Sequence, residues 1–197
     1  TIMKFCRKIC SITLCLIIIS CSSISRNEKH RHIGDGTKEL RKRQTIEEYK
    51  RNTLPRIEKF LTKLSLAGAG ELVYEESDYD ETCGENKERK NYLSANIKGR
   101  SIDVNKVIKY GNDILKPAGF SKRTERKYDN GDIVLYWLNV KDGGYVSLTV
   151  SPQDFIGIFY VSGCRPTDGT TTPSPSLTPK KTWSGYETTT HSGTNKG

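Results

Sequence analysis

The segment from Asp132 to Cys164 places the strongest constraint on the fold. It contains three apolar stretches, DIVLYWLNV, YVSLTV and DFIGIFYVSGC, which are separated by KDGG and SPQ. Short apolar stretches bounded by turn-forming residues are typical of strands. In the second stretch, one face would carry Val146, Leu148 and Val150. Asn130-Gly131 is a tight-turn signal that would join the first stretch to a polar strand, FSKRTERKY. This part of the chain therefore predicts consecutive antiparallel strands.

Two helices are predicted before these strands. Thr45 and Glu48 have the spacing of a capping box. The helical spacing that follows is kept by Ile46, Tyr49, Ile57, Phe60, Leu61 and Leu64. Pro55 interrupts this run, so we expect a kink or a break near residues 52–54. Asp103 is placed to cap the second helix, whose buried stripe would consist of Val104, Val107, Ile108, Ile114 and Leu115.

Two further strands, ELVYEES and YLSANIKG, are expected between the helices, on either side of a polar loop, DYDETCGENKERKN, that carries Cys83. The predicted fold class of residues 44–165 is α+β. It is a two-layer sandwich in which about two helices pack on one face of an antiparallel sheet of five to six strands. Residues 166–197 are rich in Thr, Ser and Pro, and we expect them to form a disordered tail.

The first 21 residues indicate export. Three basic residues precede an apolar run, residues 9–19, that is too short to span a bilayer. A basic start followed by such a run is typical of a secretory signal peptide. The run ends in Ile18-Ile19-Ser20-Cys21, which resembles the lipobox of bacterial lipoproteins. This resemblance implies that residues 1–20 are a lipoprotein signal peptide and that Cys21 carries a diacylglycerol thioether and an acylated amine. The alternative is an ordinary secretory signal.

The lipobox also implies a location. Two or more acyl chains anchor a protein stably to a bilayer without a spanning helix. The predicted location is therefore the extracytoplasmic face of the cell membrane, with the lipid anchor at Cys21 as the contact with the membrane. Residues 21–43 would form a polar, basic linker between this anchor and the domain. The linker is interpreted either as solvated or as lying against anionic lipid head groups.

The net charge of +9 is unevenly distributed. Residues 26–43 contain seven basic and three acidic residues, whereas residues 44–165 contain nineteen basic and eighteen acidic residues. A nucleic-acid-binding protein concentrates its positive charge on the folded domain. We therefore predict no nucleic-acid partner, and a polyanion bound by residues 26–43 remains a third hypothesis.

Cys83 and Cys164 are the two cysteines outside the first 21 residues. In an exported domain such a pair indicates a disulfide bond. Half of a metal site is the alternative, but it lacks partners because no CxxC occurs and His30, His32 and His191 all lie outside residues 44–165. We predict no metal and no cofactor.

No catalytic residue is predicted. Without a histidine in residues 44–165, Ser-His and Cys-His arrangements are unavailable to this domain. The acidic residues 75–81 offer oxygen ligands for Ca²⁺, but they lack the spacing of an EF-hand loop. A solvated acidic loop is the simpler interpretation. The prediction is a protein that is not an enzyme, and the alternative is a hydrolase that acts on the cell wall through carboxylates alone.

Aromatic residues are concentrated in the β-rich third of the chain: Tyr136, Trp137, Tyr145, Phe155, Phe159 and Tyr160. Alternation along a strand sends some of them into the core and others to the open face of the sheet. Core packing would account for most of these residues. The hypothesis for function is a binding module whose open sheet face recognises an unknown envelope protein or glycan.

The order of these features resembles the LppA-type actinobacterial lipoproteins. A lipobox is followed by a helix with a Tyr-Lys/Arg-rich start, EEYKRNTLPRIEKFL, a loop cysteine at Cys83, the stretch DNGDIVLYWLNV and a final Ser162-Gly163-Cys164. The resemblance covers residues 21–165. It implies a cell-envelope lipoprotein in which Cys83 and Cys164 are paired.

Overall fold

The computed structural model describes residues 34–75, 78–84 and 89–170. The helical elements in order are η1 (Leu40–Lys42), α2 (Ile46–Glu48), η2 (Tyr49–Thr53), α3 (Leu54–Leu64), η3 (Ser65–Ala69) and α4 (Val104–Ile114). The strands are β1 (Val73–Tyr74), β2 (Tyr79–Cys83), β3 (Arg89–Leu93), β4 (Ile97–Arg100), β5 (Lys122–Lys127), β6 (Ile133–Leu138), β7 (Tyr145–Ser151), β8 (Phe155–Val161) and β9 (Arg165–Pro166).

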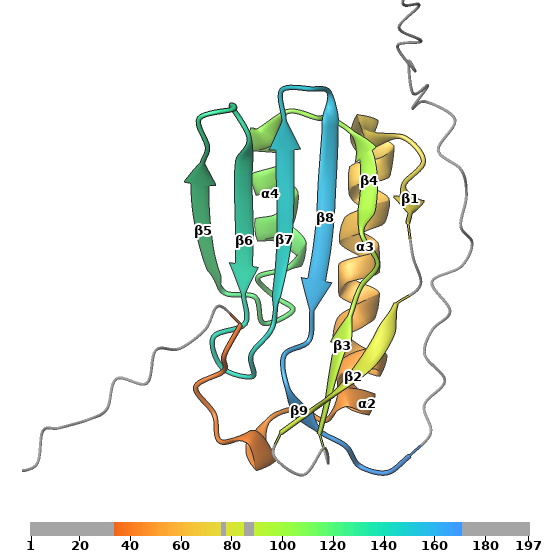
Figure 1. Cartoon of the computed structure of the whole chain (residues 1–197), viewed down its shortest axis with the longest axis vertical. Coiled ribbons are helices and arrows are strands. Elements are labelled where there is room, and N and C mark those ends of the chain that lie inside the picture. The colour runs from red at the N-terminus through yellow and green to blue at the C-terminus, as the bar shows by residue number, and fades with distance from the viewer. Residues whose placement is uncertain (1–33, 76–77, 85–88, 171–197) are drawn as a thin grey trace, which may run out of the picture. The chain divides into compact units, whose positions relative to one another are not determined.

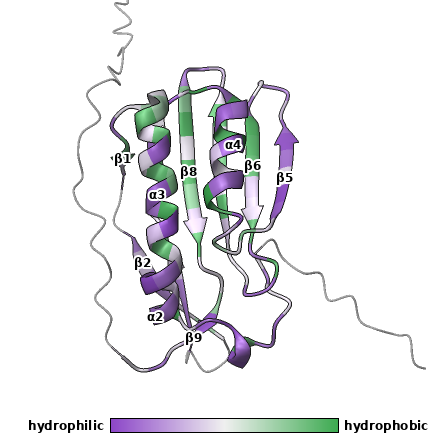
Figure 2. Cartoon of the chain, turned by 180° about the vertical axis from the view of Figure 1, so that it is seen from behind, coloured by the Kyte–Doolittle hydropathy of each residue, from purple (hydrophilic) through white to green (hydrophobic). Residues whose placement is uncertain are grey.

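The predicted α+β class is confirmed. One antiparallel sheet has the strand order β1-β4-β8-β7-β6-β5, and β3 adds pairs with β2, β8 and β9. Figures 1 and 2 show helices α3 and α4 on the same face of this sheet. The predicted number of five to six strands is wrong, because the described part of the sheet has nine. The predicted strand ELVYEES is present as the two-residue β1. The additional strands are β2, the two-residue β9 and one that arises because the predicted strand YLSANIKG is divided between β3 and β4.

The predicted polar loop around Cys83 is a β-hairpin. Strands β2 and β3 pair from Tyr79 opposite Leu93 to Cys83 opposite Arg89. Strand β2 is mostly exposed, so its sequence needs no alternating apolar residues and gives no strand signal. The disulfide to Cys164 and the pairing of β3 with β9 fix the hairpin instead.

The predicted strand YLSANIKG is divided by a bulge. Leu93 lies opposite Val161 and Ile97 lies opposite Ile158, so four residue steps on one strand match three on the other. Ser94 occupies the interruption, where its backbone N–H donates to Tyr160 O at 3.0 Å. Its hydroxyl accepts from Tyr160 N at 2.9 Å. The extra residue bends the strand, and these two bonds satisfy the backbone that the bulge leaves unpaired.

The first helix continues past Pro55. The capping box is present, since Glu48 N donates to Thr45 Oγ1 at 3.2 Å and Thr45 N donates to Glu48 Oε2 at 2.9 Å. Where we expected a kink or a break, the helix widens to the π turn η2, in which Leu54 N bonds to Tyr49 O. A proline ring clashes with the carbonyl four residues earlier, and a wider turn relieves that clash without ending the helix.

The core lies between the helices and the inner face of the sheet. Val107 and Leu115 of the second helical segment are fully buried, as are five residues of the first: Tyr49, Leu54, Ile57, Phe60 and Leu64. Figure 2 shows hydrophilic residues on the outward sides of α3 and α4. Trp137 of β6 stacks edge-on against Phe60 with ring centroids 5.8 Å apart. The opposite face of the sheet carries no helix in the described body (Figure 1).

Candidate functional site

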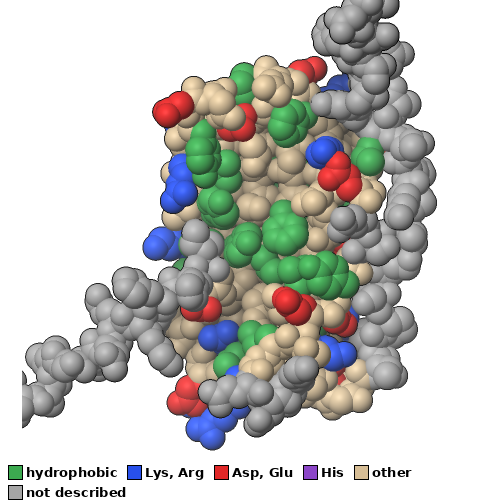
Figure 3. Space-filling view, viewed as in Figure 1, with side chains coloured by type: hydrophobic (Ala, Val, Ile, Leu, Met, Phe, Trp, Pro, Cys, Tyr) green, Lys and Arg blue, Asp and Glu red, His purple; other side chains and the backbone are tan. Residues whose placement is uncertain are grey.

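The open face of the sheet carries three aromatic side chains in contact. Tyr136 of β6, Tyr145 of β7 and Phe159 of β8 are half-buried. The ring centroids of Tyr136 and Tyr145 lie 5.9 Å apart, and those of Tyr145 and Phe159 lie 6.4 Å apart. Figure 3 shows hydrophobic side chains gathered on this face over the strands β6 to β8. We call these three residues the aromatic row.

Alternation separates the predicted aromatic residues between the two faces. Trp137 and Tyr160 are fully buried on the helix side, whereas Phe155 is half-buried on the open face beside the aromatic row. The prediction that some aromatic residues serve the core and others the open face is therefore confirmed. Because core packing does not require Tyr136, Tyr145 or Phe159 to be aromatic, these side chains are available for contact with a partner.

A shallow depression of about 290 Å³ lies beside the aromatic row, over strands β4, β8 and β7. Gly157 forms its floor, and its polar rim includes Ser147, Thr149 and Asn96. Phe159 lines one side of the depression and also belongs to the aromatic row, so the depression and the aromatic row form one continuous surface. On the other side, Lys98 Nζ lies 2.5 Å from Glu75 Oε1, and both side chains are more than a third exposed. This rim therefore offers hydroxyl, amide and charged groups around an apolar wall.

A buried tyrosine cluster lies on the helix side of the sheet and consists of Tyr49, Tyr92 and Tyr160. The ring centroids of Tyr49 and Tyr92 are 6.3 Å apart, and those of Tyr92 and Tyr160 are 6.4 Å apart. The Tyr92 hydroxyl donates to Asp78 Oδ2 at 2.5 Å, and Ala95 N donates to Asp78 Oδ1 at 2.8 Å. Burial raises the pKa of the Asp78 carboxyl above its ordinary value, and these two hydrogen bonds only partly oppose the shift. Among the described residues, the buried hydroxyls of Tyr49 and Tyr160 have no hydrogen-bond partner.

Among the described residues, the carboxyl groups of Glu58 and Asp78 have raised pKa values, so they are the acids to weigh for the hydrolase alternative. Burial raises the pKa of Glu58, and the nearby Asp78 charge adds to this shift. However, both oxygens of Asp78 are already bound by the protein. The acids of residues 75–81 are also divided: Glu75 pairs with Lys98, and Asp80 Oδ2 lies 2.7 Å from the buried Lys50 Nζ. Among the described residues, no group of three or more His, Cys, Asp or Glu side chains is placed to hold a metal ion.

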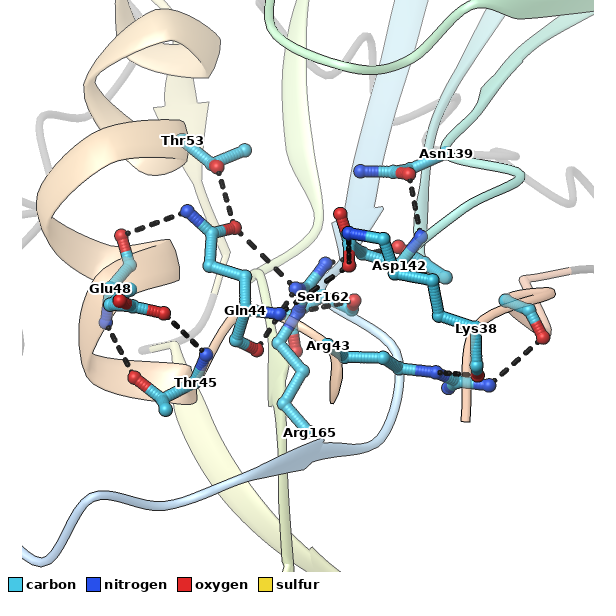
Figure 4. Close-up of polar contacts among 12 residues, drawn as sticks. Lys38, Arg43, Gln44, Thr45, Glu48, Thr53, Asn139, Asp142, Ser162 and Arg165 are labelled. Carbon is cyan, nitrogen blue, oxygen red and sulfur yellow. Dashed lines mark hydrogen bonds and ion pairs between the residues drawn. The ribbon is translucent and has the colours of Figure 1, made fainter. Parts of the chain in front are cut away.

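The chain that enters the domain is fastened to one end of the sheet. We call residues 34–45 the strap. Thr37 N and Lys38 N donate to the carbonyls of Val140 and Lys141 in the turn after β6, at 2.9 and 3.0 Å. Arg43 donates to Gly36 O within the strap at 2.9 Å and to Cys164 O at 3.2 Å (Figure 4). The predicted linker therefore ends in a segment that belongs to the folded body.

Arg165 holds this end together from inside. It is fully buried, and its guanidinium donates to Ser162 O at 2.9 Å, to Gly143 O at 3.1 Å and to Gln44 O at 3.3 Å (Figure 4). The group also lies 4.8 Å from the centroid of the Tyr49 ring. Within the described residues, no carboxylate forms an ion pair with it, and burial lowers the pKa of Arg165. Carbonyl dipoles and one ring face therefore replace a counter-ion.

Cys83 and Cys164 form the expected disulfide, with Cα atoms 6.1 Å apart. It joins the β2–β3 hairpin to the segment that follows β8. The predicted lipidation residue, Cys21, lies outside the described residues, as do His30, His32 and His191. Within residues 34–75, 78–84 and 89–170, no helix is long and apolar enough to cross a bilayer.

The model of one protein family, DUF4853, matches residues 42–173, which is most of the described body. The chain belongs to the DUF4853 family. That family is described as a domain of unknown function. The crystal structure of a DUF4853 family protein from Actinomyces odontolyticus ATCC 17982 is 20% identical in sequence, with a TM-score of 0.56. The match covers 72% of this chain and 81% of that chain, and it shows a shared fold. A search of curated proteins found no match.

The depression of this DUF4853 domain was missed by sequence reasoning. One signal was present: Gly157 interrupts the apolar run FIGIFYV, and a glycine inside a strand marks a bulge or a close approach of another group. The family assignment leaves the LppA-type resemblance as a hypothesis, because it rests on the lipobox and on the order of elements. The functional argument for this DUF4853 protein therefore depends on its own surface.

Proposed function

We propose that this protein is a lipid-anchored cell-envelope protein that binds a glycan or an envelope protein through the open face of its sheet. One observation carries the proposal: the aromatic row lies on the face opposite the helices, next to a depression with a polar rim. Aromatic side chains that are partly exposed supply a large apolar contact area together with polar edges. Binding by such a face needs no catalytic group.

The anchor half of the proposal rests on the lipobox that ends at Cys21. Thirteen residue steps separate Cys21 from Gly34, where the described body begins, so this segment can reach at most about 45 Å. The strap then enters the domain beside the turn after β6.

The anchor is tested by intact mass spectrometry of the protein isolated from native membranes. We expect a mass that begins at Cys21 and includes two or three acyl chains. We also expect the Cys21→Ser variant to move to the soluble fraction. A soluble wild-type product that is cut elsewhere and carries a free Cys21 thiol would contradict the anchor and leave a secreted domain.

The binding face is tested by sedimentation of the purified protein with isolated cell-wall sacculi and, separately, with solubilised envelope proteins. We expect the double variant Tyr136→Ser/Tyr145→Ser to lose at least about tenfold in retention, because central aromatic contacts dominate interface energies. A matched double variant on helix α4, Lys109→Ser/Asp113→Ser, removes an exposed ion pair and should bind like the wild type. Equal retention of all three proteins would contradict the proposal.

A further inference from the structure

Gly157 lies at the centre of the depression, and the fold does not require a glycine at this position. A Cβ atom built there would be 4.0 Å from Thr149 Cβ and 4.0 Å from Phe155 Cε2, which is ordinary van der Waals contact. The glycines that need a positive φ are elsewhere in the described chain. A glycine inside a strand weakens it by up to about 1 kcal/mol relative to a residue with a side chain. The consequence of Gly157 is therefore an open floor on the exposed face.

The groups around this floor combine an apolar wall with a ring of donors and acceptors. Phe159 provides the wall, and the hydroxyls of Ser147 and Thr149 can each donate and accept. On the opposite rim, the Lys98 ammonium donates and the Glu75 carboxylate accepts. The Ser147 hydroxyl already donates to Phe159 O at 3.2 Å, so it can serve a ligand as an acceptor.

The size and the chemistry of the site match one sugar ring. A volume of about 290 Å³ is at the lower end of the range for small-molecule sites. A pyranose has an apolar C–H face, which packs on an aromatic ring, and hydroxyl groups along its edge, which both donate and accept hydrogen bonds. An aliphatic side chain would offer no hydrogen-bonding group to the Lys98–Glu75 pair or to the two hydroxyls, and a phosphate would be repelled by Glu75 as well as attracted by Lys98.

We propose that the depression over Gly157 is the primary subsite for a single saccharide ring of a glycan, with Phe159 as the stacking wall and with Thr149, Lys98 and Glu75 as hydrogen-bonding groups. This inference rests on the proposed function, because it makes a glycan the partner of the open face. The remaining aromatic row, Tyr136 and Tyr145, would then contact the next units of the same glycan.

The test is a saturation-transfer difference NMR titration of the full chain with N-acetylglucosamine, N-acetylmuramic acid, glucose, galactose, mannose and rhamnose. We expect at least one of these sugars to bind saturably. The Gly157→Val variant should weaken that binding by about tenfold or more, because the side chain fills the floor. Its melting temperature should be equal or higher, because valine favours a strand and meets open space.

A second pair of variants separates a lost contact from a changed fold. Thr149→Val removes a rim hydroxyl without changing shape and should weaken binding several-fold. The same substitution at Thr124, on the open face of the edge strand β5, should leave it unchanged. Saturable binding that Gly157→Val and Thr149→Val leave intact, or no binding of any of the six sugars, would overturn the inference. If envelope proteins or sacculi still bind through Tyr136 and Tyr145 in those cases, the proposed function stands while the sugar subsite fails.

Discussion

Replacing Gly111 with alanine should destabilise the domain, although alanine is the better helix former. Gly111 lies in α4 where the helix crosses the sheet. A Cβ atom there would be 2.2 Å from Cζ2 and 2.4 Å from Cε2 of Trp137, whose side chain is fully buried. Carbon atoms in contact normally lie about 3.5–4.0 Å apart. The helix or the indole must therefore move by more than about 1 Å.

The magnitude follows from two opposed terms. The change from glycine to alanine within a helix favours folding by about 1 kcal/mol. Overpacking a rigid core contact costs about 1–3 kcal/mol and sometimes more. The upper end applies here, because the obstacle is a large indole that also packs against Phe60. We expect a net loss of about 2 kcal/mol, or about 7 °C in the melting temperature of a domain of this size.

The assay is thermal and urea denaturation followed by circular dichroism, with the exposed α4 variant Asn105→Ala as the control. That control should be neutral or slightly stabilising. The double variant Gly111→Ala/Trp137→Leu should lose less than the sum of the two single changes, because the smaller leucine leaves room for the methyl group. A Gly111→Ala protein as stable as the wild type would refute the packing of α4 on β6.

Three further predictions concern Arg165 beside the strap, the disulfide and Asp78 beside the tyrosine cluster. Arg165→Met should lower the free energy of unfolding by about 2–4 kcal/mol in urea titrations, since two buried carbonyls and one partly buried carbonyl lose their donor. Reducing the disulfide between Cys83 and Cys164, which are 81 residues apart, should cost about 4 kcal/mol in the same assay. Burial raises the folded-state pKa of Asp78, so the contribution of this carboxyl to stability should fall as pH rises above about 3.9, the unfolded value, through the folded pKa. Asp78→Asn should lack that fall.

The controls for these predictions are exposed residues of the same type. Arg41→Met changes a side chain that is 81% exposed and should leave the urea midpoint unchanged. Asp129→Asn, on an exposed turn, should keep the pH dependence of the wild type. The Arg165 prediction would be contradicted if Arg41→Met and Arg165→Met lost the same free energy of unfolding. The disulfide prediction would fail if reduction left the urea midpoint unchanged. The Asp78 prediction would fail if Asp78→Asn had the same dependence of stability on pH as the wild type.

The parts of the fold that follow from local pattern were predictable. Strands β6, β7 and β8 alternate between core and surface residues, and Asp103 caps α4 by accepting from Lys106 N at 3.1 Å. The β2–β3 hairpin was not predictable, because its exposed strand β2 carries charged residues and the hairpin depends on a distant disulfide and on β9. A kink or a break was predicted where the π turn η2 precedes Pro55, because the sequence does not show that tertiary packing of the flanking apolar residues keeps the helix continuous there.

The site was predictable only in outline. The sequence predicts an open sheet face with aromatic residues, but the sharing of Tyr136, Tyr145 and Phe159 among three adjacent strands depends on the register. The Lys98–Glu75 pair also joins residues that no sequence spacing relates. Residues 34–43 of the strap were predicted as part of a polar linker, because their contacts join them to residues about a hundred positions later and leave no mark on composition.

The most direct test of the account is site-specific photo-crosslinking in living cells, with benzoylphenylalanine at position 136 on the open face and, in a second strain, at position 109 on α4. The probe is larger than tyrosine, but position 136 is on the open face of the sheet, and the Lys109 side chain is 70% exposed, so neither replacement should disturb the core. We predict crosslinks to glycan or to a discrete envelope protein from position 136 and none from position 109. Crosslinks from position 109 alone would contradict the claim that the open face of the sheet is the binding surface.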